Sequence, residues 1–136
     1  MKRWRFLVGA LIAWLSLLAL GEVFPVFTVG FWRLSVASRF VMFSGIDNPY
    51  ARLPEAKLFL RIYGSGNPES AFLQLYRFGN QQAKAFALYG LHEIGSDRFE
   101  EVASTFVTAG GEVRLVVTTC SASEVPASTV LEFIRQ

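Results

Sequence analysis

The chain has 136 residues, a formal net charge of +2 and 52% hydrophobic residues, among them thirteen Phe. A chain of this length supports one hydrophobic core, and apolar residues that continue to the C-terminus exclude a disordered chain. A nucleic-acid-binding surface needs a patch of clustered basic residues. The net charge is low and the basic residues cluster only at the N-terminus, so the sequence excludes such a surface.

The first twenty residues are typical of an export signal. Lys2, Arg3 and Arg5 form a basic start, and the next fifteen residues, Phe6–Leu20, carry no charge. Basic residues stay on the cytoplasmic side while an apolar helix enters the bilayer. The rest of the chain is therefore expected outside the cytoplasm.

Two fates of residues 1–21 are open. Ala19-Leu20-Gly21 has the small-x-small spacing of a signal-peptidase site, and cleavage after Gly21 would give a periplasmic or secreted protein that begins at Glu22. Alternatively, the segment stays as an inner-membrane anchor, with membrane contact through Phe6–Leu20. A spanning helix usually needs about 20 apolar residues, more than this stretch provides.

Residues 22–53 are expected to connect this segment to a domain. Val23–Val29 is rich in β-branched residues and is predicted to be a strand if the leader is removed, or the far end of the membrane segment if it is kept. Helical spacing then predicts an amphipathic helix over Phe31–Phe43, packed on the domain or lying on a membrane surface. Its apolar stripe consists of Trp32, Val36, Phe40 and Phe43.

Residues 54–136 are predicted to form a helical domain, because apolar residues recur at helical spacing and a glycine ends each run. The sequence Asn67-Pro68 predicts an N-cap followed by proline at the first helical position, and Asp97 with Glu100 predicts a capping box. The closing glycines are Gly64, Gly79, Gly95 and Gly110. The expected inward faces of the four helices are Ala56, Phe59, Leu60 and Tyr63; Phe72, Leu75 and Tyr76; Ala83, Phe86, Ala87, Gly90, Leu91 and Ile94; and Phe99, Val102, Ala103, Phe106 and Val107.

After these helices the apolar period changes to two, which predicts one strand over Glu112–Cys120. Its partner is open: Val23–Val29, a second chain, or no regular element. Residues 121–123 are expected to lead into a last helix that begins at Val125 or Pro126. The fold class is mainly α, a compact bundle of short antiparallel helices with one strand in the C-terminal half, preceded by a hydrophobic export or anchor helix.

Residues 83–107 resemble a helical hairpin of the HEAT or armadillo type, with Ala83, Ala87 and Gly90 as small contact residues and Leu91 and Phe106 as larger partners. The resemblance implies a surface that binds other proteins and no chemistry of its own. The tract from Ala87 to Leu91, with a later strand that ends in Cys120, is also similar to small exported bacterial proteins, from which no activity carries over.

The candidate catalytic residues are Cys120 and His92, the single cysteine and the single histidine. They could form a nucleophile and base only if they meet in space. Otherwise Cys120 is an inert buried thiol or links two chains. One Cys and one His are too few for a structural zinc site, and Gly64-Ser65-Gly66 lacks the third glycine of a dinucleotide fingerprint, so no metal or cofactor is expected.

The leading hypothesis is a non-catalytic, exported or membrane-anchored domain that binds a protein partner, in an immunity, inhibitor or envelope-assembly role. One alternative is a thiol-dependent enzyme or redox protein that uses Cys120. Another is a membrane-embedded subunit in which Phe6–Val29 is retained. No nucleic-acid partner is expected, and the sequence leaves the oligomeric state open.

Overall fold

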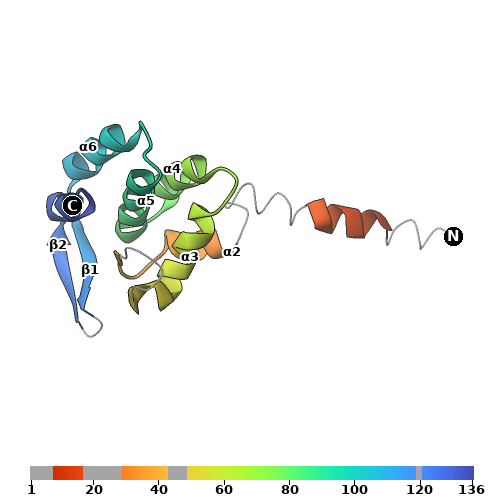
Figure 1. Ribbon diagram of the computed structural model, residues 1–136, viewed down its shortest axis with the longest axis horizontal. Coiled ribbons are helices and arrows are strands. Elements are labelled where there is room, and N and C mark those ends of the chain that lie inside the picture. The colour runs from red at the N-terminus through yellow and green to blue at the C-terminus, as the bar shows by residue number, and fades with distance from the viewer. Residues whose placement is uncertain (1–7, 17–28, 43–48, 119–120) are drawn as a thin grey trace.

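The computed structural model describes residues 8–16, 29–42, 49–118 and 121–136. Helices dominate the described part, and two antiparallel strands form a small sheet (Figure 1). Residues 8–16 are helical and stand apart from the body in Figure 1. The remaining elements are α2 (Val29–Ser35), the 3₁₀ turn η2 (Pro49–Arg52), α3 (Pro54–Tyr63), α4 (Pro68–Phe78), α5 (Gln81–Glu93), α6 (Phe99–Ala109), β1 (Glu112–Thr118), β2 (Ser121–Pro126) and α7 (Ala127–Ile134).

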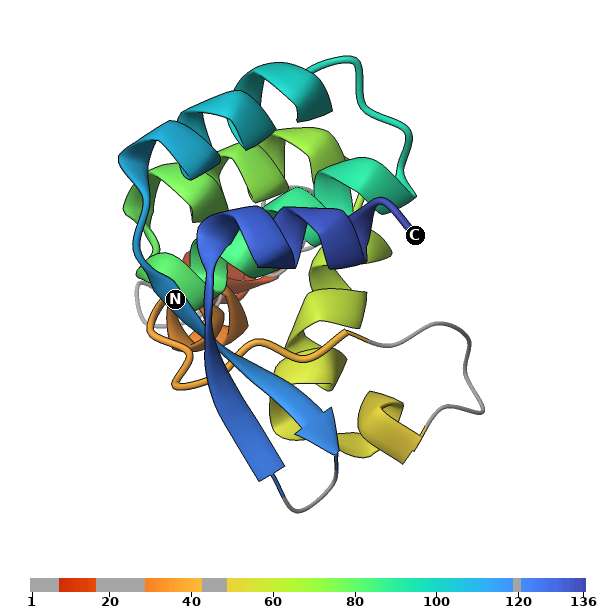
Figure 2. The same cartoon turned by 90° about the vertical axis from the view of Figure 1, so that its left-hand side faces the viewer.

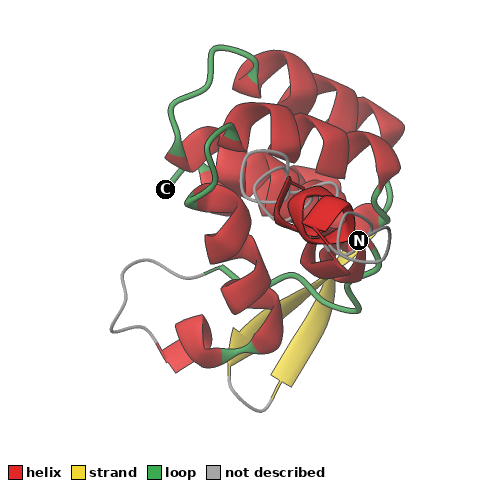
Figure 3. Ribbon diagram, turned by 90° about the vertical axis from the view of Figure 1, so that its right-hand side faces the viewer, coloured by secondary structure: helices red, strands yellow, loops and turns green. Residues whose placement is uncertain are grey.

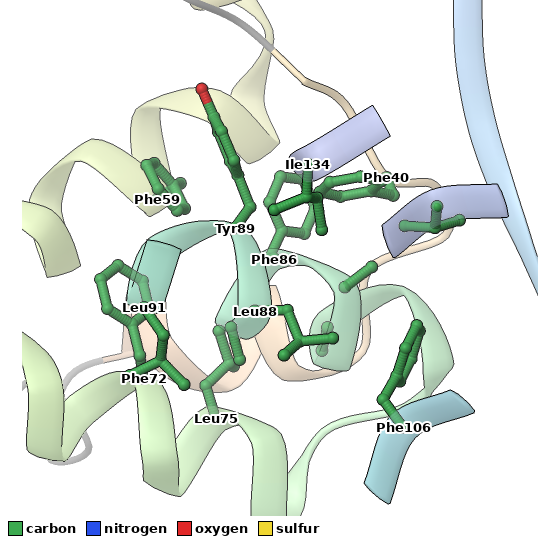
Figure 4. Packing of buried hydrophobic residues seen from close by; sticks show 14 of the residues in the cluster. Phe40, Phe59, Phe72, Leu75, Phe86, Leu88, Tyr89, Leu91, Phe106 and Ile134 are labelled. Atoms are coloured by element: carbon green, nitrogen blue, oxygen red, sulfur yellow. The ribbon is translucent and has the colours of Figure 1, made fainter. Parts of the chain in front are cut away.

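Helix α5 is the centre of the molecule. It packs against α2, α3, α4, α6, α7 and β1, and every residue from Ala85 to Leu91 is buried. Figure 4 shows side chains of α5 directed to several sides, where rings and aliphatic chains from the other elements meet them. The sequence predicted that only one face of this helix is buried, whereas side chains on all of its sides are buried. Only Lys84 is charged between Ala83 and Leu91, and a helix that is apolar all round is a buried one.

Local capping groups define the starts of α4 and α5 and the end of α5; the roles of Asn67 and Gly95 were predicted, and that of Asn80 was not. The side chains of Asn67 and Asn80 accept hydrogen bonds from the backbone N–H groups of Ser70 and Ala83 at the starts of α4 and α5. At the end of α5, Gly95 has a φ of 65°, and the Ser96 N–H donates to the Leu91 carbonyl at 2.9 Å. This arrangement is a Schellman motif, which satisfies carbonyl groups that the helix leaves unpaired.

The start of α6 differs from the prediction. Arg98, in helical backbone conformation, is the N-cap residue, and no side chain caps the helix. The hydroxyl of Ser96 accepts from the Arg98 N–H at 3.2 Å. Asp97 therefore does not form the predicted capping box with Glu100, because a turn stabilised by Ser96 precedes the helix.

Helices α4 and α5 touch closely at Gly90. A Cβ atom at this position would lie 2.4 Å from the Phe72 ring, so only glycine leaves room for the ring. Phe72 is fully buried and packs beside Phe59 of α3, with ring centroids 5.2 Å apart. Gly90 is one of the small residues of the HEAT-like pattern in residues 83–107. It faces α4, a helix that precedes this segment in the chain.

The two strands form a hairpin at one end of the body (Figure 2). The prediction of a single strand is wrong, because β2 pairs antiparallel with β1. Strand β1 is described over Glu112–Thr118, and the predicted end at Cys120 lies outside the described residues. The partner is none of the three alternatives left open by the sequence. Segment Ser121–Pro126 contains few residues with a high strand propensity. It forms a strand mainly because it pairs with β1, and its own composition contributes less.

The other edge of β1 binds Phe40. The Phe40 N–H donates to the Arg114 carbonyl at 2.7 Å, and the Val116 N–H donates to the Phe40 carbonyl at 3.0 Å. Phe40 is fully buried against Phe86, with ring centroids 5.0 Å apart. These contacts hold the chain between α2 and η2 against the sheet.

The predicted helix over Phe31–Phe43 is too long. Helix α2 ends at Ser35, and the chain to Met42 is irregular. The Asn80 N–H donates to the Ser35 carbonyl at 2.8 Å, which directs the chain away from the helix. The buried residues of α2 are Phe31, Leu34 and Ser35, and the predicted inward residues Trp32 and Val36 are exposed; Phe43 lies outside the described residues.

Smaller departures concern α3, α6 and α7. Leu60 and Tyr63 of α3 were expected inward, but each is 42% exposed, and Ile62 is buried instead. Val107 at the end of α6 is likewise exposed. Helix α7 begins at Ala127, one or two residues later than predicted, because β2 continues through Pro126.

Candidate functional site

The two candidate catalytic residues are not brought together in the described structure. Cys120 lies outside the described residues. His92 is in the last turn of α5, half-buried, with its ring edge-on to Phe99 at a centroid distance of 5.1 Å. Its Nδ1 atom has no hydrogen-bond partner among the described residues, and the nearest carboxylate oxygen, from Glu93, is 3.7 Å away. A Cys120–His92 pair stays a prediction.

Two of the acidic residues at the junction of α5 and α6, Glu100 and Glu101, form ion pairs with arginines. The guanidinium of Arg98 donates to Glu101 at 2.8 Å, and this hydrogen bond raises the pKa of Arg98. Arg135 of α7 donates to Glu100 at 2.6 Å. In the described part of the chain, no group of three or more His, Cys, Asp or Glu side chains could hold a metal ion.

The N-terminal segment is described in part. Residues 8–16 form a helix, and each of these side chains is exposed, with Leu11, Ile12 and Trp14 more than half accessible. Within the ranges described here, no helix has both the length and the apolar character needed to span a membrane.

Exposed apolar side chains gather where the N-terminal chain joins the domain. Val29, Trp32 and Val36 follow one another at helical spacing along the outer side of α2 and are 76%, 49% and 71% exposed. The Trp32 ring lies beside Phe78 at the end of α4, with centroids 6.1 Å apart, and Phe78 is 53% exposed. We call these four residues the α2 patch.

Two cations border the α2 patch. The Arg77 guanidinium lies over the Phe78 ring, 5.5 Å from its centroid, and Arg33 follows Trp32 on α2. Both are exposed, and neither forms an ion pair with any of the described residues. The patch thus combines aromatic rings with unneutralised positive charge.

The hairpin presents a second accessible feature, the outer edge of β2. The backbone groups of Arg114 and Val116 face Phe40, so by strand alternation the backbone groups of Val113 and Leu115 face β2. The backbone groups of their partners, Val125 and Ser123, face β1. The backbone groups of Ala122 and Glu124 therefore lie on the outer edge of β2. No strand pairs with this edge in the described structure.

The described turn at residues 64–66 has a structural role. The Ser65 hydroxyl donates to the Ile62 carbonyl at 2.7 Å, and Gly64 caps the end of α3. These bonds satisfy the end of one helix and do not form an anion-binding loop.

The chain was compared with protein-family models, curated proteins and solved structures, and no significant match was found in any of the three. The resemblance of residues 83–107 to a HEAT or armadillo hairpin therefore stays a prediction.

Sequence reasoning named two residues of the α2 patch but placed them on the wrong side of the helix. Both sides of this short segment carry large apolar residues, Phe31 and Leu34 on one and Trp32 and Val36 on the other. Spacing alone cannot decide which side is buried. The neighbouring Arg33 was a usable signal, since an arginine next to Trp32 favours an outward ring.

Proposed function

We propose that the chain is a non-catalytic domain that its N-terminal segment holds at the outer face of the inner membrane, where it binds a protein partner through the outer edge of β2. The single observation that carries the proposal is this open edge, on a hairpin whose β2 side chains are almost all exposed. Unpaired backbone groups along an edge strand are a template for pairing with an extended segment of another chain.

The position of the hairpin supports this reading. Figure 1 has β1, β2 and α7 at the opposite end of the body from the N-terminal residues, and Figure 3 looks from the N-terminal side. A domain tethered by its N-terminus would therefore present the hairpin toward the aqueous compartment. Retention of the segment Phe6–Leu20 is also compatible with the fold, because β1 obtains its partner from β2 and does not require Val23–Val29.

The edge can also be read as a protected one. Glu124 and Pro126 are residues that natural proteins use to prevent edge-to-edge aggregation, and the strand is short. These features prevent indiscriminate pairing but leave the N–H and carbonyl groups of Ala122 available. A selective partner that accommodates the charge of Glu124 is therefore the reading we adopt.

The test is site-specific photo-crosslinking in living cells of the native host. A photoreactive phenylalanine analogue in place of Glu124 is expected to give one adduct of defined mass, and the same analogue in place of the exposed Lys57 on α3 is expected to give none. Alkaline carbonate extraction of the same cells should leave the chain in the membrane fraction. Release into the soluble fraction would contradict the tether.

A proline substitution then separates edge pairing from other contacts. Ala122→Pro removes an outward N–H and should abolish the adduct without changing the thermal unfolding midpoint, because β1 does not use that group. Ser123→Pro is the matched variant, since it removes an inward N–H and should destabilise the hairpin. An adduct that survives Ala122→Pro would rule out binding by strand addition.

A further inference from the structure

The α2 patch is a group of exposed apolar side chains near the point where the N-terminal chain enters the domain. Three of its members, Val29, Trp32 and Val36, are exposed, whereas Phe31, Leu34 and Ser35 on the other side of α2 are buried in the core. A single exposed apolar residue is ordinary, but a contiguous set that includes tryptophan marks a contact surface.

The chemistry of the patch matches a lipid–water interface. Tryptophan prefers the headgroup level of a bilayer, where its ring is in apolar surroundings and its N–H remains hydrated. Arg33 and Arg77 have no acidic partner in the described structure, and basic residues are attracted to a negatively charged lipid surface. A protein surface of this composition would need an acidic partner, whereas anionic lipid supplies both the charge and the apolar layer.

Chain length limits how far the patch can lie from the membrane. Eight residues, 21–28, separate Leu20 from Val29, so the Cα atoms of these two residues lie at most about 32 Å apart when the chain is fully extended. If Phe6–Leu20 is in the bilayer, α2 is the first described element outside it. The outer side of α2 is then the surface that meets the headgroups first.

We infer that the α2 patch, with Arg33 and Arg77, rests on the anionic surface of the bilayer that holds the N-terminal segment. This inference rests on the proposed function in one respect, the retention of Phe6–Leu20 in the membrane. It adds an orientation to the tether: the domain lies with α2 and the end of α4 on the lipid, and the hairpin points away from it.

The test uses the full chain with Trp4→Phe and Trp14→Phe, so that Trp32 is the single tryptophan. The protein is reconstituted into vesicles of phosphatidylethanolamine and phosphatidylglycerol that contain brominated lipid, and co-flotation is measured first. Trp32 emission is expected to shift to shorter wavelength and to lose most of its intensity. A control chain that also carries Trp32→Phe and Phe133→Trp places the reporter on α7, where it should stay unquenched.

Charge variants test the role of the arginines. Arg33→Gln with Arg77→Gln should reduce the quenching of Trp32 several-fold, as should vesicles of phosphatidylcholine alone. Arg114→Gln with Arg135→Gln makes the same change of charge at the hairpin end and should leave quenching unchanged. Far-UV circular dichroism of each variant verifies the fold.

The outcomes separate the two proposals. A chain that floats with vesicles but whose Trp32 is unquenched, or is quenched no more than the α7 reporter, overturns the inference and leaves the tether intact. Short-wavelength emission without quenching means that protein covers the patch, from a second copy or from the chain itself, and also overturns it. A chain that does not float overturns both.

Discussion

Gly90 lies directly against the ring of Phe72, and the packing of the two central helices depends on this contact. The sequence marked Gly90 as a small residue on a helix face, which is correct, because spacing within one helix is a local property. It could not identify the neighbour, since Phe72 is on a different helix and its ring direction is set by Phe59 and the rest of the core.

Gly90→Ala is expected to destabilise the protein. The added Cβ would lie 2.4 Å from a fully buried ring, and overpacking costs about 1–3 kcal/mol, whereas the better helix propensity of alanine returns about 1 kcal/mol. We expect a net loss of up to about 2 kcal/mol in the free energy of unfolding, measured by urea denaturation.

The control for this change is Gly64→Ala, where the nearest atom to a new Cβ is the Leu60 carbonyl oxygen at 3.4 Å. This substitution should be neutral or slightly stabilising. Phe72→Leu combined with Gly90→Ala should cost less than the sum of the single changes. Strict additivity would show that the ring and the Cβ do not compete for space.

At the scale of the elements, some caps were predictable and lengths were not. Asn67 was predicted as an N-cap and acts as one, Asn80 acts as an N-cap that was not predicted, and the capping box predicted at Asp97 does not form. The end of α2 and the existence of β2 depend on distant residues: Ser35 bonds to Asn80, and Ser121–Pro126 is a strand through its pairing with β1. For the same reason the open edge of β2, the basis of the proposed site, could not be derived from the sequence.

Asn80→Ala is expected to cost more than Asn67→Ala. Asn80 accepts from the Ala83 N–H at 2.9 Å and also donates from Nδ2 to the Ala37 carbonyl at 2.7 Å, 43 residues away in the sequence. Loss of the cap and of this second bond should together reduce the free energy of unfolding by about 2 kcal/mol.

Asn67 offers the matched control, because its side chain makes only the capping bond, which is longer at 3.3 Å and exposed. Its removal should cost about 0.5–1 kcal/mol. Asn80→Ser keeps a capping oxygen but does not reach Ala37, so its effect should be intermediate. Equal losses for both alanine variants in chemical denaturation would contradict a role for Asn80 in joining α2 to α5.

At the scale of the whole molecule, the mainly helical class was predicted correctly, and the arrangement around a central helix was not. The composition of α5 contained the signal, since Ala85, Leu88 and Tyr89 are apolar on the side opposite the predicted face. Which elements cover this helix is a property of the assembled chain. Phe40 from before η2 and Ile134 from α7 both belong to the same core as α5.

Hydrogen exchange should reproduce this arrangement. Amides of α5 between Ala87 and Leu91 are surrounded on all sides and should exchange only through global unfolding, whereas the outward amides of β2 at Ala122 and Glu124 should exchange within the fastest group. Mass spectrometry or NMR of the full chain in detergent can measure both. Slow exchange at Ala122 in the isolated protein would indicate that the edge is already covered and would contradict the binding proposal.

The burial of residues 85–91 of α5 has a consequence for the order in which the core can close. Helix α7 is one of the elements that cover this stretch, and it follows the other elements of the core in the sequence. Until α7 has packed, the core around α5 is incomplete on that side. A folding intermediate in which only the elements from α2 to β1 have docked therefore still exposes apolar surface that the native structure buries.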